Sequence, residues 1–290
     1  MNERILPQDA LHFAHEAMNT TFGLWLRGVD ATAAPGIAKM CYELVDSIES
    51  RLSRYIDNSE VSQINALSAG ETLYLSEECH QCLLLALDAY TRTAGLFDIT
   101  LGAGIQHLKA GEKGPMPPVI GQLIIHPDVP AITCVAPGRQ IDLGGIAKGF
   151  TLDLLKYFLL EWEVEDALIT AGASSMLAIG SGQWPVELSG SSHSLEIGLC
   201  DQSLSASGMI IQGSHIVHPA GMDAMPVVPC SHVWVTATSA AVAEIWSTAL
   251  MLIAADEIPS FIVGNDDVLS VHVEIAGALK KIWPLHELSI

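Results

Sequence analysis

Basic residues are scarce in this chain. It has 13 lysines and arginines against 33 aspartates and glutamates, which gives a formal net charge of −20 at pH 7. Nucleic-acid phosphates demand a basic footprint and anionic membranes attract basic segments, so this charge argues against both partners. An anionic small ligand would need a helix terminus, a lysine or a divalent metal beside it. The acidity by itself also fits a simple role in solubility.

Long hydrophobic runs are missing as well. No stretch of about 18 residues is uninterruptedly apolar, so we predict no membrane span. The first residues contain no basic segment followed by an apolar one, and no cysteine that could take a lipid. We therefore expect a cytoplasmic protein from this sequence; a periplasmic or membrane-anchored location would apply if a leader segment precedes it.

Cysteines are few and scattered, with six in 290 residues, which excludes a small disulfide scaffold. Cys79 and Cys82 have C-x-x-C spacing, but no second pair completes a zinc site, and both fall in a helical pattern. We predict helix thiols, with a redox or metal role as the less favoured alternative. Since the chain is 50% hydrophobic and 16% charged, it can bury the core of one large domain or of two closely packed lobes.

The most informative segment that is present is I-D-L-G-G-I-A-K-G-F, residues 141–150. An apolar run ends in two glycines, and Lys148 and Gly149 lead into a helical pattern. Glycine lets a backbone approach a ligand closely, and the N–H groups of a helix start favour an anion. This predicts a site for a phosphorylated ligand, although the spacing is neither a P-loop nor a Rossmann fingerprint. The alternative is a tight strand-to-helix turn with a solvated lysine.

The distribution of apolar residues predicts strands and helices that mix without a regular βαβ repeat, which favours an α+β fold. Residues 102–121, rich in glycine and proline, predict a mobile loop. Helices are expected at 33–55, 59–65, 76–93, 148–160 and 239–255, and strands at 18–28, 167–170, 231–237, 261–263 and 268–274, with a hairpin over 184–199.

Seven separated motifs then follow one another in the order of a known family. They are M-N-T-T (18–21), L-S-R-Y with D-N-S-E-V-S-Q-I-N (52–65), G-L-F-D-I-T (95–100), the 141–150 segment, L-S-A-S-G (204–208), H-I-V-H-P-A-G (215–221) and A-E-I-W-S-T-A-L (243–250). On these residues the chain resembles the ApbE-type FAD:protein FMN transferases over roughly residues 17–255.

The resemblance implies a two-lobed α+β fold with mixed or antiparallel sheets, packed helices and an FAD cleft between the lobes. Residues 1–16 would be an N-terminal extension, and 17–290 a single catalytic domain. The implied activity is metal-dependent cleavage of FAD, in which FMN is transferred to a Thr or Ser of a target flavoprotein and AMP is released.

The resemblance also implies ligand-binding residues, each with a plainer alternative. Tyr55 would be the platform for a flat ring, or a tyrosine that covers the core. Ser59 and Glu60 would contact the adenine side, or form an N-cap and a first-turn acid. Lys148 would contact a phosphate or the closing lobe. The full implied set for FAD is Met18, Tyr55, Ser59, Glu60, Asp98, Thr100, Lys148, Gly172, Ser207 and Gly208.

The implied metal ligands are the Ala147 carbonyl, Glu244 and Thr248. Residues 244 and 248 share one helix face, and oxygen ligands suit Mg²⁺. Without the resemblance, they are an acid near a helix start and a buried threonine. The implied base for the acceptor hydroxyl is His215, since histidine titrates near neutrality. His218 is close enough in sequence to share this work or merely pack.

The chain departs from the family pattern at several of these positions. Glu244 and His218 stand where the family has aspartate, Ala173 replaces a glycine, and Ala206 replaces a threonine. A longer carboxylate shifts or weakens a site for Mg²⁺, which demands near-octahedral geometry. Two alternatives to the transferase therefore stay open: an FAD pyrophosphatase, and a catalytically silent flavin-binding protein.

Overall fold

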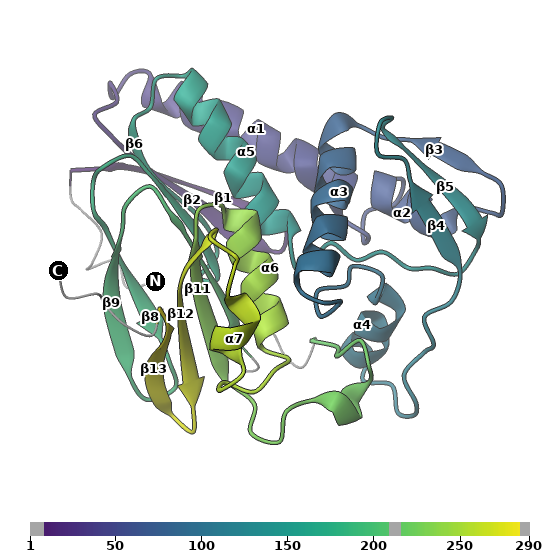
Figure 1. Ribbon diagram of the computed structural model, residues 1–290. Coiled ribbons are helices and arrows are strands. Elements are labelled where there is room, and N and C mark those ends of the chain that lie inside the picture. Colours follow the sequence, from purple (N-terminus) through teal and green to yellow (C-terminus); the bar gives the residue numbers. More distant parts are fainter. Residues whose placement is uncertain (1–8, 209–215, 285–290) are drawn as a thin grey trace. The chain divides into compact units, whose positions relative to one another are not determined.

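The computed structural model describes residues 9–208 and 216–284 (Figure 1). The chain forms two compact units built from interleaved segments. The first unit contains Met1–Asp46, Lys148–Gly208 and Pro226–Ile290, and the second contains Ser47–Ala147 and Met209–Met225. Helices and antiparallel sheets occur in both, which confirms the predicted α+β class.

The first unit is organised around an eight-stranded sheet whose neighbouring strands are all antiparallel. Its order is β1-β2-β6-β7-β10-β11-β12-β13. The strands are β1 (Leu11–Ala17), β2 (Thr20–Arg27), β6 (Asp166–Ala171), β7 (Ser175–Ile179), β10 (Ser203–Gly208), β11 (His232–Ala237), β12 (Val268–Ile275) and β13 (Ala278–Trp283).

Both faces of this sheet are covered, as the alternation along β6 illustrates. Ile169 faces a cluster that includes residues of α1 (Ala34–Leu52) and α5 (Ala147–Glu161). Leu168 faces the opposite cluster, which includes Trp184. That tryptophan begins the hairpin of β8 (Trp184–Ser189) and β9 (Ser194–Leu199), so the hairpin predicted over 184–199 is confirmed (Figure 1).

Helix α6 (Ala240–Leu250) is buried along almost its whole length and begins at the N-cap Ser239, whose hydroxyl accepts the Val242 N–H. Asp153 of α5 completes this helix start. Its carboxylate accepts the Ser239 hydroxyl and the N–H groups of Ala240 and Ala241 at 2.8–2.9 Å. A carboxylate satisfies donors that have no partner inside the helix and complements the helix dipole. Asp153 therefore ties α5 to α6.

Gly149 allows the same two helices to approach each other closely. A Cβ at this position would lie 2.4 Å from the Ala240 carbonyl oxygen, which is far inside van der Waals contact. The glycine of the sequence motif thus has a packing role inside the first unit.

A tight hairpin turn replaces part of the strand predicted at 18–28. Met18 and Asn19 both have positive φ, 50° and 57°, and connect β1 to β2 in a two-residue loop. Such a turn follows the right-handed twist of the paired strands. The residues before it pair with β2 from Leu11 onward, so the last part of the predicted extension 1–16 belongs to the sheet. The domain boundaries themselves stay a prediction.

The second unit combines helices with a three-stranded antiparallel sheet of order β3-β5-β4. Ser59 and Ser76 cap α2 and α3 with their hydroxyls, as predicted for Ser59. The elements are α2 (Glu60–Ala66), β3 (Thr72–Tyr74), α3 (Glu77–Arg92), α4 (Gly102–Lys109), β4 (Gln122–Ile125), β5 (Ala131–Ala136) and a 3-10 turn (Met222–Ala224).

Two further segments differ from the expected secondary structure. Helix α4 occupies the first part of the predicted loop 102–121. Its glycine Gly102 leaves room for a neighbouring side chain and does not make the segment mobile. A Cβ at Gly102 would lie 2.3 Å from the Arg54 guanidinium. In the first unit, α7 (Ile258–Ile262) replaces the strand predicted at 261–263. A proline in its first turn has the fixed φ that suits a helix start.

The cysteines agree with the sequence analysis, since none of the six forms a disulfide and Cys79 and Cys82 are buried thiols of α3. Within residues 9–208 and 216–284, no helix is both long and apolar enough to cross a bilayer. The compartment stays a prediction.

Replacing Asp153 with alanine should lower the free energy of unfolding by about 1–3 kcal/mol, because three donors at the start of α6 lose their acceptor. Urea denaturation measures this change. Asp256→Ala, at an exposed position of the same unit, is the matched control and should change stability little. Equal stability of the two variants would contradict the capping role.

Candidate functional site

A largely buried ion pair lies among the polar residues of the first unit. Lys148 Nζ lies 2.9 Å from Glu244 Oε1, and the two side chains are 15% and 6% exposed. The pair joins the first turn of α5 to the first turns of α6. Burying a charge is costly unless it is paired and hydrogen-bonded, so each of these residues requires the other.

Glu244 has two further donors. The Gly149 N–H donates to Oε2 at 2.7 Å, and the Ser175 hydroxyl at the start of β7 donates to Oε1 at 2.9 Å. The sequence predicted a phosphorylated ligand at the start of α5, which stays a prediction; in the structure the Glu244 carboxylate accepts the Gly149 N–H there. Whether Lys148 also contacts a ligand phosphate stays a prediction.

A row of hydroxyl groups extends from this ion pair along α6. Ser247, one turn after Glu244, lies 3.1 Å from the Glu244 carbonyl oxygen and 2.9 Å from the Ser207 hydroxyl. Ser205 of β10 lies 3.2 Å from the same Ser247 oxygen. The structure therefore brings Lys148, Glu244 and Ser207 into one hydrogen-bonded network.

The predicted metal ligands offer oxygen atoms, which suit a hard divalent cation. Thr248 follows Glu244 by one helical turn and is half-buried, and Ala147 is the first residue of α5. Mg²⁺ prefers oxygen ligands of these kinds, and the ammonium of Lys148 shows that the Glu244 carboxylate receives a cation. In the described part of the chain, no three His, Cys, Asp or Glu side chains gather as a metal site. A metal here would therefore depend on hydroxyl and carbonyl oxygens.

Two predicted ligand residues have backbone conformations that side-chain-bearing residues rarely adopt. Gly172 has a φ of +63°, and a Cβ there would lie 2.3 Å from the Thr20 hydroxyl. Met18 reaches positive φ although it is not glycine, and its sulfur lies 4.0 Å from the Thr151 hydroxyl. Positive φ in a non-glycine residue stores strain, which the paired strands on both sides of the turn offset.

Gly208 lies against the ring of His232, which forms a buried pair with the Glu274 carboxylate. A Cβ at Gly208 would lie 2.4 Å from the ring of His232, so only glycine fits without a shift. His232 Nδ1 lies 2.7 Å from Glu274 Oε2, and Ser191 and Ser231 also donate to this carboxylate. Burial raises the pKa of Glu274, but the hydrogen bonds from Ser191, Ser231 and His232 outweigh it and lower the pKa to about 2.

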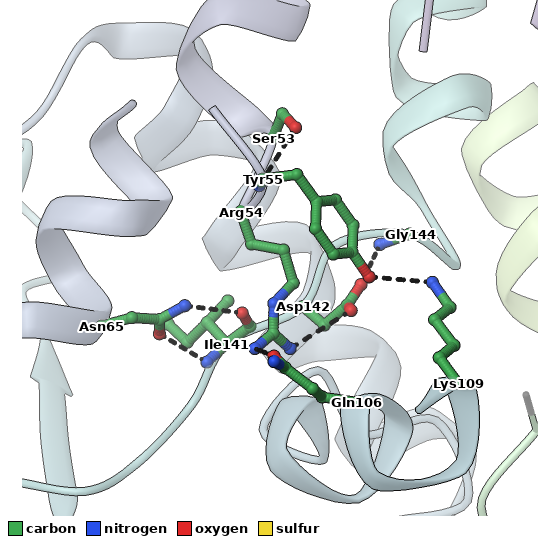
Figure 2. Close-up of polar contacts among 9 residues, drawn as sticks. All are labelled: Ser53, Arg54, Tyr55, Asn65, Gln106, Lys109, Ile141, Asp142 and Gly144. Carbon is green, nitrogen blue, oxygen red and sulfur yellow. Dashed lines mark hydrogen bonds and ion pairs between the residues drawn. The ribbon is translucent and has the colours of Figure 1, made fainter. Parts of the chain in front are cut away.

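In the second unit, Tyr55 is the most accessible predicted ligand residue. The residue is 63% exposed, and Lys109 Nζ donates to its hydroxyl at 2.9 Å (Figure 2). The preceding residue, Arg54, is instead buried and pairs with Asp142 at 3.3 Å. Gln106 of α4 accepts a second hydrogen bond from Arg54 at 3.1 Å. The backbone of Tyr55 is thus fixed by its neighbour while its ring faces solvent.

The start of the 141–150 segment is held by α2. The Asn65 amide donates to the Ile141 carbonyl oxygen at 2.9 Å and accepts the Ile141 N–H at 2.7 Å (Figure 2). Asp142 additionally accepts the Gly144 N–H at 2.8 Å. The last residue of one sequence motif therefore anchors the beginning of another.

Other predicted residues of this unit already have partners in the chain. Ser59 is buried, accepts the Ser62 N–H and donates to the Ser53 carbonyl oxygen. Glu60 accepts the Ser76 N–H. Both observations fit the plainer alternative of a helix start, and contact with a ligand stays a prediction for both.

Asp98 and Thr100 are half-buried and form a turn in which the Asp98 carboxylate accepts the Thr100 N–H at 2.7 Å. Thr100 also lines a largely apolar cavity of this unit, together with Met116, Pro118, Gln140 and His218. The His218 ring accepts the Ala220 N–H at 3.1 Å, which fits a packing role. His215, the predicted base, lies outside the described residues.

The sequence analysis did not single out several residues of these networks, among them Arg54, Lys109, Asp142 and Ser175. Asp142 carries a signal in the sequence, because an acid between apolar residues requires a partner. The partner itself, 88 positions earlier, has no such signal. Ser175 and Lys109 become visible only through the contacts of the folded chain.

Comparison with known proteins gives one consistent result. A family model described as the ApbE family matches residues 18–272. The FAD:protein FMN transferase of Buchnera aphidicola is 24% identical over 250 residues, which are 75% of this chain and 73% of that protein. The enzyme of the same name from Klebsiella pneumoniae is 23% identical over 164 residues, and the match spans about half of each protein, 52% and 51%.

Solved structures resemble the fold along nearly the whole chain. The flavin transferase ApbE from Vibrio cholerae superposes with a TM-score of 0.80 at 19% identity and covers 95% of this chain and 97% of that one. The apo flavinyl transferase ApbE of Pseudomonas stutzeri gives 0.80 at 20% identity, with 94% of each chain covered. At these identities the likeness establishes the fold.

Stability should fall as the pH drops from about 4.5 towards 2, because Glu274 has its ordinary pKa of 4.5 when unfolded and about 2 when folded. The unfolded state then binds more protons than the folded one. Urea midpoints across this range should fall more steeply for the wild type than for Glu274→Gln. Glu196→Gln, exposed on β9, should keep the wild-type profile; parallel profiles of all three proteins would contradict the role of Glu274.

Replacing Lys148 with methionine should lower the free energy of unfolding by about 3 kcal/mol, since it leaves the Glu244 charge buried without its cation. Lys39→Met removes an exposed pair with Glu43 and should cost at most about 0.5 kcal/mol. Adding Glu244→Gln to Lys148→Met should recover part of the loss in urea denaturation. A Lys148→Met variant as stable as the control would disprove the importance of the pair.

Proposed function

Since the chain belongs to the ApbE family, we propose that it is an FAD:protein FMN transferase. In this reaction a hydroxyl of a target flavoprotein attacks the phosphorus of the FMN half of FAD. The pyrophosphate bond breaks, FMN becomes attached to the threonine or serine, and AMP leaves. The names of the relatives from Buchnera and Klebsiella support this proposal.

The single observation that carries the proposal is the cationic and hydrogen-bonding environment around Glu244. Lys148, the start of α5 and the hydroxyls of Ser207 and Ser247 lie in one network. An enzyme acting on a pyrophosphate needs such groups, because charge develops on the phosphate oxygens as the bond breaks. In a chain of net charge −20, a lysine with a side chain only 15% exposed at this place is a specific feature.

We assign a Mg²⁺ ion to Glu244 and Thr248, with the Ala147 carbonyl as the third ligand implied by the family. When bound, this ion would neutralise phosphate charge and polarise the bond that breaks. The Glu244 carboxylate and the Thr248 hydroxyl are of the type that Mg²⁺ accepts. Lys148 would have to leave Glu244 or share it, so the affinity for metal should be modest.

The remaining roles follow the resemblance and the described contacts. Tyr55 offers an exposed ring for stacking against a flat heterocycle. Gly172 and Gly208 lie where a Cβ would meet the side chains of Thr20 and His232, and their contact with FAD is what the resemblance implies. His215 would remove the proton from the acceptor hydroxyl as general base.

A second candidate function is a flavin-binding protein without turnover. It is favoured by one observation: the two oxygens of Glu244 already have three donors, one of which is a lysine. If Lys148 does not release this carboxylate, the protein would bind FAD and leave it intact.

The deciding experiment incubates the purified protein with FAD and Mg²⁺, with and without an acceptor peptide that carries a threonine, and separates AMP and flavin species by chromatography. AMP together with flavin-labelled peptide, both abolished by EDTA, is the expected result. AMP with free FMN would instead identify an FAD pyrophosphatase. Bound but intact FAD, with each of several flavoprotein acceptors, would establish the binding protein.

Glu244→Gln tests the site within the same assay. It keeps the shape of the side chain but removes its charge, so kcat/KM should fall about tenfold or more. Glu161→Gln, exposed at the end of α5, is the matched control and should retain wild-type turnover. Turnover that Glu244→Gln leaves unchanged would refute the assignment of the metal to this carboxylate.

A further inference from the structure

Helix α4 ends in a lysine that lies against the exposed ring of Tyr55. Lys109 Nζ is 2.9 Å from the Tyr55 hydroxyl and 5.1 Å from the centre of the ring (Figure 2). Lys109 itself is exposed. An accessible aromatic surface and an accessible ammonium group therefore lie side by side in the second unit.

The charge of Lys109 is not neutralised by the described part of the chain. There it forms no ion pair, whereas its neighbour in Figure 2, Arg54, is buried and paired with Asp142. An ammonium group has three donors, and the Tyr55 hydroxyl uses one of them. Two donors and a full positive charge remain available beside the ring, in a chain where acidic residues outnumber basic ones by 33 to 13.

The fold does not need this lysine to hold α4 in place. The helix start is fixed by the Gly102 N–H, which donates to the Gln140 carbonyl oxygen at 3.0 Å, and Gln106 binds Arg54 one turn before Lys109. A surface contact of a lysine contributes little to stability, because ordering the long side chain costs entropy. A contribution to ligand binding explains its position better than a contribution to folding.

We infer that Lys109 binds a phosphate group of the ligand that stacks on Tyr55, and so makes this surface selective for phosphorylated flavins over uncharged ones. The inference rests on the proposed function, since it takes FAD as the ligand. A flat ring stacked on Tyr55 would lie beside Lys109 Nζ, which is 5.1 Å from the centre of the Tyr55 ring. The free donors of Lys109 can then form charge-assisted hydrogen bonds to phosphate oxygens, which are stronger than neutral ones.

The test compares the dissociation constants of FAD and riboflavin, measured by flavin fluorescence in the presence of EDTA. Lys109→Met should weaken FAD binding about five- to tenfold and leave riboflavin binding unchanged. Lys109→Arg should retain most of the FAD affinity. Lys113→Met, an exposed lysine four positions later, is the matched control and should change neither constant. Added salt should weaken FAD binding more in the wild type than in Lys109→Met.

Two results would overturn the inference while leaving the proposed function intact. Equal weakening of FAD and riboflavin by Lys109→Met would mean that the lysine only orients Tyr55. Unchanged FAD binding in this variant would mean that it makes no contact. A wild-type protein that binds neither compound would instead overturn the proposed function, and the assignment of Lys109 with it.

Discussion

The first unit depends on keeping one carboxylate charged while it is buried. Glu244 lies on a helix that is almost completely enclosed, and water contributes little to its solvation. Its charge therefore has to be balanced by Lys148 and by hydrogen bonds from α5 and β7. This requirement explains why the two helices approach closely at Gly149, and Asp153 binds the same start of α6 through the N–H groups of Ala240 and Ala241.

The second unit contains side chains that are held by hydrogen bonds and ion pairs, and beside them side chains that are exposed to solvent. Arg54 and Asp142 form an ion pair with each other, and Asn65 makes two hydrogen bonds to the backbone of Ile141, the residue before Asp142. Tyr55 and Lys109 are adjacent to this rigid part but expose their ring and charge. Binding groups placed on a rigid support lose less freedom when a ligand arrives, which favours affinity.

Local signals allowed much of the fold to be predicted. Serine followed by helical periodicity located α2, α3 and α6, because a cap acts within a few residues. The high glycine content led to the wrong prediction of a loop at α4, because Gly102 provides space for the Arg54 guanidinium and not flexibility. The candidate site was predicted from motifs, but the partners of Glu244 were not, since Lys148 and Ser175 reach it from 96 and 69 positions away in sequence. Contacts at such separations are decided by topology, which no local pattern encodes.

The interleaving of the two units has a consequence for how the chain reaches its native state. Strand β2 pairs with β6, as in the partnership of Phe22 with Ala171, and the whole stretch Ser47–Ala147 lies between them. Closing a loop of that length early in folding is entropically unfavourable and slow. If the second unit condenses first, it shortens the effective span and brings the two strands within reach. The inserted unit would then act as an intramolecular folding aid for the sheet that surrounds it in sequence.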